Sequence, residues 1–300
     1  MDLSESGSRI FLNNFCATSR KLRGTRFSND ARFLQIFSLL AMFTFGVLGR
    51  DFNVTSTKIL WIGATALVSQ LVLIQFWKFP FSSLLSASIS ALGMMLLCRT
   101  NSVPVLSAAM ALAIFSKVIF RWQGKHFFNP TNFGIMVVYL FSGAVWVSPG
   151  QWGDDFLMLI WILMMGTVVV GGARRYDISL TFLVAHIGLI GSRVLYLGQS
   201  AAVFWHQLAN GSLIIFAFFM ISDPRSTPNH KVGRMVFAVS VALLAYYFRI
   251  KLFNPQALLW ALFILSPITV ILDSVLRARR FEWKPSAKEI VYAKPVIALS

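Results

Sequence analysis

The tripeptide Phe128-Asn129-Pro130 occurs a second time, 125 residues further along the chain, as Phe253-Asn254-Pro255. Each copy follows a basic stretch and precedes a long apolar segment. A further proline stands 26 residues upstream of the proline in the first copy and 27 residues upstream in the second, at Pro104 and Pro228. With matching numbers of apolar segments, this recurrence indicates that the chain consists of two repeats.

The composition identifies the environment in which these repeats fold. Of 300 residues, 57% are hydrophobic and 13% are charged, whereas soluble domains carry about 25% charged residues. The mean hydropathy is +0.70. These values exclude a soluble enzyme and a disordered chain. The two cysteines, Cys16 and Cys98, are too few for a disulfide framework or for a self-contained zinc or iron–sulfur site. A polytopic membrane protein remains.

A spanning helix needs about 20 mainly apolar residues, and the chain offers ten such segments. They are residues 33–49, 58–77, 81–98, 103–120, 131–147, 156–172, 178–196, 208–222, 235–250 and 256–276. Five helices per repeat is an odd number, so the second repeat must be inverted relative to the first. The sequence therefore predicts an all-α polytopic membrane protein with about ten transmembrane helices in two inverted five-helix repeats. The predicted parts are a basic tail (1–31), one membrane domain (32–277, with repeats 32–150 and 151–277) and a second basic tail (278–300).

The net charge of +16 predicts the orientation in the membrane. With the N-terminus in the cytoplasm, 21 of the 27 lysines and arginines fall at cytoplasmic ends and loops, with Lys117 among them, and 6 fall outside. Such a bias follows the positive-inside rule. We therefore expect both termini in the cytoplasm, and we interpret the charge as a contact with membrane lipid and not with nucleic acid. A docking site for a partner on the basic tail is the less favoured interpretation.

Polar groups inside the predicted membrane domain are few, and each has two interpretations. The Asn-Pro pairs are expected to interrupt or to start helices, because proline removes a backbone donor and asparagine caps helix N-termini. Asp223 either ends a helix with a salt bridge or faces a cofactor at the repeat interface. His186 is interpreted as a packing residue. The eleven acidic residues avoid helix midpoints, which argues against a carboxylate proton relay, and no hydrolytic or phosphate-loop motif is present.

Three segments resemble a known family. They are residues 125–134 (KHFFNPTNFG), residues 222–228 (SDPRSTP) followed by Gly233-Arg234, and residues 261–268 (ALFILSPI) followed by Asp273. Their order and spacing resemble the NqrB subunit of sodium-translocating NADH:quinone reductase and the RnfD subunit of the Rnf complex, over most of residues 70–275. The short loops also resemble a branch of this family that accompanies enediyne biosynthesis, the UnbU-type proteins.

The resemblance implies ten helices in two inverted halves, a fold similar to urea transporters, and a flavin held between helices. Asn129 corresponds to a family contact to riboflavin. A second contact, usually asparagine, corresponds here to His126. We therefore expect a noncovalent riboflavin or FMN near His126, Asn129, Asn132 and Asp223, with no metal site and no catalytic residue.

A second family flavin, FMN bound through a phosphoester, is not expected in this chain. Family members carry it on the threonine of an S-G-A-T segment. Here Ser142-Gly143-Ala144-Val145 falls within the predicted helix 131–147 and ends in valine, which has no hydroxyl. Gln256 stands where the family tends to have an acid after the second-repeat proline, which weakens the case for ion translocation.

The leading hypothesis is a membrane-embedded electron-transfer subunit of an oxidoreductase complex in the bacterial inner (plasma) membrane. Its expected partners are other subunits or soluble redox proteins, and its role is electron relay. The alternatives are a small-solute or ion transporter or channel of urea-transporter-like fold, and a membrane scaffold for redox partners.

Overall fold

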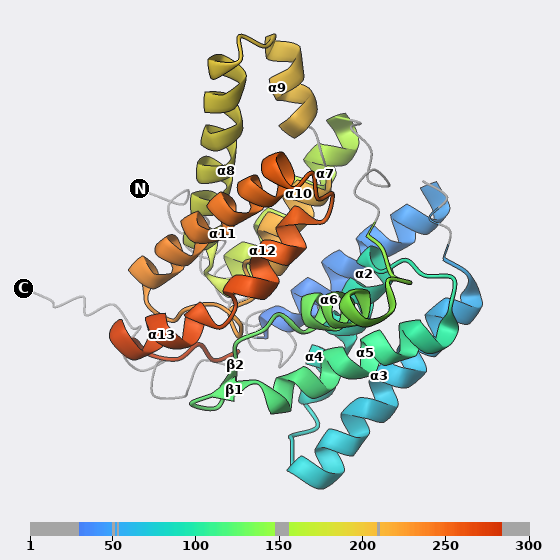
Figure 1. Cartoon of the computed structure of the whole chain (residues 1–300). Helices are drawn as coiled ribbons and strands as arrows, with labels where there is room; N and C mark the ends of the chain where they lie inside the picture. Colours follow the sequence, from blue (N-terminus) through green and yellow to red (C-terminus); the bar gives the residue numbers. More distant parts are fainter. Residues whose placement is uncertain (1–29, 50–51, 53, 148–155, 209–210, 284–300) are drawn as a thin grey trace, which may run out of the picture.

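The computed structural model describes residues 30–49, 52, 54–147, 156–208 and 211–283 (Figure 1). Most of both predicted tails and the loop 148–155 lie outside these residues. The first half contains α2 (Ala31–Gly49), α3 (Ser56–Trp77), α4 (Ser83–Leu97), α5 (Val103–Ile119), strands β1 (Arg121–Trp122) and β2 (Lys125–His126), and α6 (Pro130–Ser142). The second contains α7 (Phe156–Ala173), α8 (Tyr176–Tyr196), α9 (Ala201–Leu208), α10 (Gly211–Ile215), the π-helix η2 (Phe216–Met220), α11 (Lys231–Lys251), α12 (Ala257–Leu265) and α13 (Ile268–Val275).

The ten predicted apolar segments are all helical. Within the described residues, four helices are long and apolar enough to cross a membrane: α2, α3, α8 and α11. Two further candidates are helix pairs with a bend, of 51° between α9 and the α10–η2 helix and of 47° between α12 and α13. The remaining apolar helices, α4, α5, α6 and α7, are shorter. The chain is thus an all-α polytopic membrane protein.

Two predicted boundaries were wrong. The helix predicted over 131–147 ends at Ser142, because Gly143 adopts a left-handed conformation with φ of 61° and caps it. Ala144 and Val145 therefore lie beyond the helix and not inside it. The helix predicted over 208–222 begins earlier, at Ala201, as part of the bent pair. Polar residues between the two parts hid that continuation from a hydropathy analysis.

Helix packing repeats between the halves. In the first half α3 packs on α5, α5 on α6, and α2 on α4. In the second half α8 packs on α11, α11 on α12, and α7 on α10 and η2, which are the equivalent pairs in chain order. Contacts between the halves join α2 to α7 and α6 to α12, so each of these helices meets its own counterpart. This is the pattern expected where two repeats are related by a twofold axis.

Contacts at the two ends of the bundle fix the direction of the helices. We call the end of the bundle that carries the β1–β2 hairpin the hairpin end. The end of α13 lies there, because Lys125 of β2 bonds to Asp273. At the opposite end, Arg99 after α4 pairs through its backbone with Trp146 after α6. Hence α6 runs away from the hairpin end whereas α12–α13 runs toward it, as inverted repeats require.

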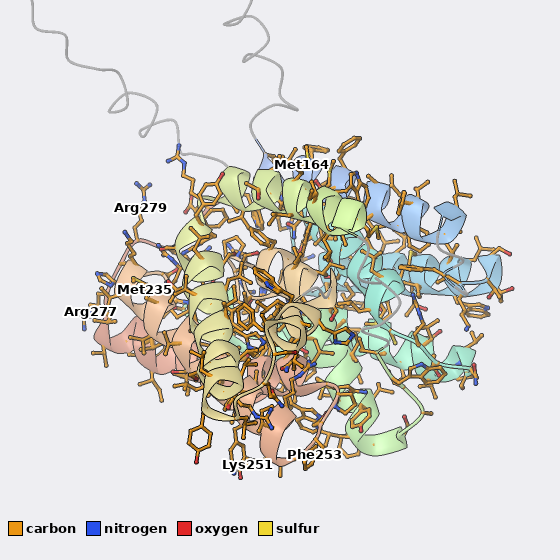
Figure 2. The ribbon with its side chains drawn as sticks, turned by 90° about the horizontal axis from the view of Figure 1, so that it is seen from above. Met164, Met235, Lys251, Phe253, Arg277 and Arg279 are labelled. Atoms are coloured by element: carbon orange, nitrogen blue, oxygen red, sulfur yellow. The ribbon has the colours of Figure 1, made fainter. Side chains whose placement is uncertain are left out.

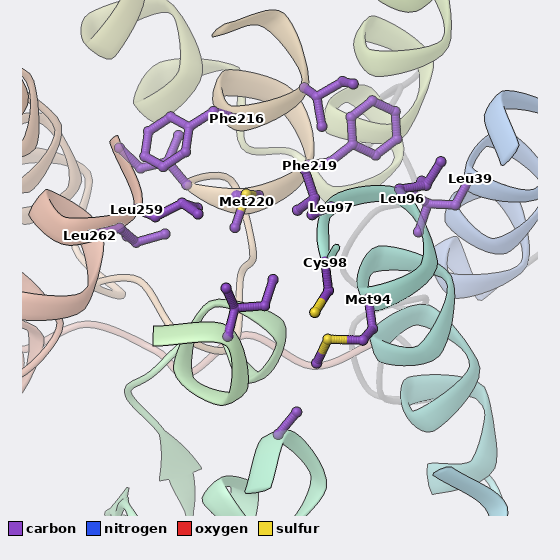
Figure 3. Packing of buried hydrophobic residues seen from close by; sticks show 14 of the residues in the cluster. Leu39, Met94, Leu96, Leu97, Cys98, Phe216, Phe219, Met220, Leu259 and Leu262 are labelled. Carbon is purple, nitrogen blue, oxygen red and sulfur yellow. The ribbon is translucent and has the colours of Figure 1, made fainter. Parts of the chain in front are cut away.

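The interior is apolar, and η2 lies at its centre. Figure 3 shows Phe216, Phe219 and Met220 of η2 between α4 and α12. The bundle also carries apolar side chains on its outside, as a lipid-facing surface does. In Figure 2, Met164, Met235 and Phe253 extend outward, and Phe253 is 85% exposed.

Candidate functional site

The β1–β2 hairpin brings two basic side chains into the interior. Gln123 and Gly124 at its tip both have positive φ, 48° and 77°, which is the geometry of a two-residue turn matched to strand twist. Arg121 pairs with His126 across the hairpin. Both residues of β2, Lys125 and His126, are buried. The hairpin thus delivers the basic stretch before the first Phe-Asn-Pro to the junction of the two halves.

Asn129 joins the halves at the start of α6. Its side-chain oxygen accepts a hydrogen bond from the Asn132 backbone N–H at 3.1 Å, which caps α6. Its side-chain nitrogen donates to the carbonyl of Met220 in η2 at 3.3 Å. Both interpretations of this residue therefore hold at once, because the helix cap also contacts the other repeat.

Asn132 lies one turn further along α6. Its side-chain nitrogen donates to the carbonyl of Leu259 in α12 at 3.2 Å. Among the described residues nothing donates to its side-chain oxygen, although that atom is buried. Buried polar atoms are normally hydrogen-bonded. An unpartnered amide oxygen at the repeat interface marks a place where a donor is missing.

Asp223 enters from the second half, in the segment after η2. Its carboxylate lies 3.9 Å from Nε2 of His126, a distance at which the groups interact electrostatically. It also accepts a hydrogen bond from the Arg225 backbone at 3.0 Å. Asp223 thus follows the end of η2 and contacts His126 of the other half, while its predicted role toward a cofactor stays a prediction.

Three of the four predicted site residues line one cavity of about 60 Å³. His126 and Asn129 come from the first half, and Asp223 comes from the second. Asn132 does not line this cavity and acts on it through its bond to Asn129. The wall also includes Gln35, Ser86, Ser90, Met220, Arg225 and Trp283. Residues from α2, α4, the hairpin, η2 and the C-terminal segment therefore meet at this point.

The second Phe-Asn-Pro borders a different cavity, of about 40 Å³, which Pro255 and Gln256 line together with His186 and Arg249. The Asn254 side chain accepts from the Gln256 backbone at 2.8 Å and so forms a local turn before α12. Phe253 projects outward with φ of 50°. Both copies therefore lie beside a cavity, but Asn254 forms a local turn, whereas Asn129 bonds to the other half.

Two buried lysines near the cavity were not recognised from the sequence. Lys117 was counted with the loop charges, but it lies in α5, is 5% exposed, and donates to the carbonyl and hydroxyl oxygens of Ser86 at 3.1 and 3.2 Å. The sequence feature that could have indicated this burial is a lysine within the last turn of an apolar helix. Lys125 bonds to Asp273, 148 residues away, at 2.6 Å. It also donates to the carbonyl of Thr227 at 2.6 Å.

Burial and charge set the protonation of the His126–Asp223 pair. Burial lowers the pKa of His126 below its ordinary value, although Asp223 opposes that shift. Burial alone would raise the pKa of Asp223, but the interactions with His126 and the Arg225 amide outweigh burial and hold it below its ordinary value. At neutral pH the cavity therefore presents a neutral imidazole beside a carboxylate. A neutral imidazole offers one donor and one acceptor.

These groups fit the polar edge of an isoalloxazine ring, which carries both donors and acceptors. A volume of about 60 Å³ holds a few water molecules, so a whole ring system enters only if a wall residue moves. Trp283 belongs to the segment after α13 and forms part of that wall. Its displacement would enlarge the site without disturbing a helix.

Comparisons with known proteins show a similarity over the second half of the chain. Residues 140–282 match the profile of the NQR2, RnfD, RnfE family. Three curated relatives are each named as the D subunit of an ion-translocating oxidoreductase complex. They come from Stutzerimonas stutzeri (29% identity over 88 residues), Halorhodospira halophila (35% over 74) and Ectopseudomonas mendocina (26% over 133). The matches cover 29%, 25% and 37% of this chain and 25%, 20% and 39% of those relatives.

The family match begins after most of α6, so it includes Asp223 and Asp273 but neither His126 nor Asn129. The resemblance to the enediyne-associated branch stays a prediction. The match covers the whole second repeat that the structure describes, together with the end of α6. Residues 140–282 of this chain are thus similar to the NQR2, RnfD, RnfE family.

Proposed function

We propose that the chain is a membrane-embedded electron-transfer subunit of an ion-translocating oxidoreductase complex. The names of its curated relatives support this proposal, since all three are the D subunit of such a complex. Its partners would be the other subunits or soluble redox proteins. The charge bias supports an inner-membrane orientation with both termini, and therefore the hairpin end, in the cytoplasm.

A noncovalent flavin at the cavity would supply the redox chemistry. The observation that carries this proposal is the convergence of His126, Asn129 and Asp223 from opposite repeats on one cavity. Bound there, a flavin would accept electrons from one partner and release them to another. The chain's own residues would hold it: Asn129 and His126 by hydrogen bonds to the ring edge, and Asp223 by fixing the orientation of the imidazole.

The apolar part of the cavity wall would control access of water. Phe219 and Met220 of η2 and Leu96 and Leu97 of α4 line its inner side. They would exclude solvent from the ring while the polar residues orient it. Asn132 would support the site indirectly, because its backbone N–H donates to the Asn129 side chain and holds it in place.

The visible absorbance of the full-length protein, purified in mild detergent from riboflavin-replete cells, tests the proposal. We expect an oxidised-flavin band that survives gel filtration and is lost on denaturation. Asn129→Leu should lose the band, and the matched change Asn254→Leu in the second Phe-Asn-Pro should retain it. Loss of one hydrogen bond with an unpaired partner costs about 1–3 kcal/mol, which weakens binding roughly fivefold to more than a hundredfold. Equal loss in both variants, or no flavin in the parent protein, would contradict the site.

We also propose that the flavin is not covalently attached. Val145 at the end of the S-G-A-V segment is buried and has no hydroxyl. A denaturing gel viewed under ultraviolet light should therefore show no fluorescent band at the mass of this chain. A fluorescent band, confirmed by a flavin-bearing peptide, would refute this.

A further inference from the structure

A second and much larger cavity lies at the hairpin end, outside the site described above. Its volume is about 830 Å³, and it is bounded by the start of α2, the turn between α7 and α8, and the segment after α13. Five arginines line it, together with the carboxylates of Asp30 and Glu282. The arginines are Arg174, Arg175, Arg234, Arg279 and Arg280. The side chains that line the cavity therefore carry an excess of positive charge.

Arg175 is the innermost of these cations. It is 4% exposed. Its guanidinium makes only long bonds, at 3.4 and 3.5 Å, to the carbonyls of Pro228 and Pro224, and it lies 5.3 Å over the ring of Phe281. Among the described residues none accepts a hydrogen bond from its Nε, although that atom is buried.

The other acid–base pairs around the cavity are already formed. Asp30 bonds to Arg32, and Asp177 bonds to Arg234. Burial, followed by the charge of Arg234, lowers the pKa of Arg175 to about 10, so its side chain stays positive at neutral pH. A buried cation with an unused donor is costly unless an anion pairs with it. A phosphate group is such a partner, because its oxygens accept several guanidinium donors at once.

An apolar groove borders the cavity at a shared wall residue. Phe37 of α2 lines both the cavity and a groove of about 620 Å³ on the lipid side of α2 and α7. The other residues that line the groove are Leu40, Ala41, Thr44, Phe45, Leu48, Gly49 and Trp161. Phe45 and Trp161 contact each other across it with ring centroids 5.1 Å apart. From Phe37 to Gly49 the groove runs along α2 for about 18 Å, which is the length scale of an acyl chain within one leaflet.

We propose that an anionic phospholipid binds at the seam between α2 and α7. Its phosphate lies among the arginines with Arg175 at the base, and an acyl chain lies along the groove. A soluble phosphate compound would use the arginines but would leave the groove unused, and a neutral lipid would do the reverse. The site therefore joins the two repeats through a lipid, where α2 meets its counterpart α7 on the outside of the bundle. It does not depend on the flavin proposal.

Lipid binding by the full-length protein tests the arginine cluster. The delipidated protein is titrated with phosphatidylglycerol or phosphatidylcholine and examined by native mass spectrometry. We expect preferential binding of phosphatidylglycerol. Arg174→Gln with Arg279→Gln should weaken it about 25-fold, at roughly fivefold for each arginine near the membrane surface. The matched control, Arg277→Gln with Lys231→Gln, removes the same charge outside the cavity and should change it less than about twofold.

The groove is tested by filling it. Ala41→Phe should reduce phosphatidylglycerol binding, and Ala64→Phe, on the exposed face of α3, should not. Inorganic phosphate alone should not displace the lipid. Equal losses in the cluster and control pairs, phosphatidylcholine binding as tightly, or displacement by inorganic phosphate would each overturn the proposal. Flavin absorbance is recorded on the same samples, so that loss of lipid and loss of flavin are distinguished.

Discussion

Replacing Lys125 by methionine should be the most destabilising single change at the hairpin end. The ammonium group makes three contacts that join the two repeats: to Asp273 at 2.6 Å, to the Thr227 carbonyl at 2.6 Å and to the Asn229 side chain at 3.3 Å. Without it, Asp273 keeps its hydrogen bond from the Asn229 backbone N–H at 2.7 Å. The lysine and aspartate side chains are 4% and 8% exposed. The change therefore leaves a buried carboxylate without its cation.

Breaking a buried ion pair from one side costs about 3–5 kcal/mol. At about 2–4 °C per kcal/mol for a chain of this size, the unfolding midpoint should fall by roughly 6–20 °C. Thermal unfolding in detergent, followed by tryptophan fluorescence, measures this shift. The matched control is Lys251→Met, at the equivalent basic stretch of the second repeat, where the lysine is exposed and points outward (Figure 2). Lys251→Met should change the free energy of unfolding by less than about 0.5 kcal/mol.

The double variant Lys125→Met with Asp273→Leu separates charge from packing. Removing both partners of a buried pair is often neutral, so the double variant should recover most of the lost stability. If Lys125→Met shifts the midpoint no more than Lys251→Met does, the ion pair does not stabilise the junction of the repeats. If the double variant is less stable than Lys125→Met, the cost arises from packing and not from the unpaired carboxylate.

Three further outcomes follow from the structure. Gly134→Ala should destabilise the folded protein by about 1–3 kcal/mol or more, because its added Cβ would lie 2.2 Å from the Ala109 carbonyl oxygen where α6 packs on α5. The control in the same unfolding assay is Gly188→Ala, which has open space around it. His126 has a folded-state pKa below the ordinary 6.5, so the unfolded chain binds the extra proton and the free energy of unfolding should fall as the pH drops below 6.5. His126→Gln should flatten this part of a curve of stability against pH. An unchanged slope would contradict the buried neutral imidazole. Reporter fusions should read external at Gly150 and Gly198 and cytoplasmic at Gly172 and His230, and a cytoplasmic signal at Gly150 would contradict the inverted topology.

The sequence predicts the helices well because the bilayer imposes strong rules on them. Apolar segments of sufficient length must form hydrogen-bonded helices in lipid, and the ten segments are found as helices. The division into two halves, which the recurrence of Phe-Asn-Pro predicts, stays a prediction that the matching helix contacts support. The boundary near Ser142 failed because a single left-handed glycine ends the helix within an apolar run, and hydropathy does not register backbone conformation.

The site was predictable only in part. Asn129 and Asp223 were identified by their motifs, and the structure brings both to one cavity. The bond from Lys125 to Asp273 could not be derived, because it joins β2 to α13 across 148 residues, about half of the chain. Arg175 also escaped notice, because charge counting assigned it to a loop. A loop position gives no indication that a side chain is buried.

The π-helix η2 has a consequence for how this region can vary. Its defining bond runs from the Ile221 amide to the Phe216 carbonyl at 3.0 Å, five residues apart, so the turn holds one residue more than an α-helical turn. Removing any one residue from Phe216–Met220 would replace the wide turn by an α-helical one and shift the chain beyond it relative to α6 and the hairpin. Asp223 would then face away from His126, and the Met220 carbonyl would leave Asn129. Substitutions in η2 by apolar residues of similar volume should be tolerated. A change of its length by one residue would instead break the contacts between the two repeats. Chain length in η2 is therefore under stricter constraint than residue identity.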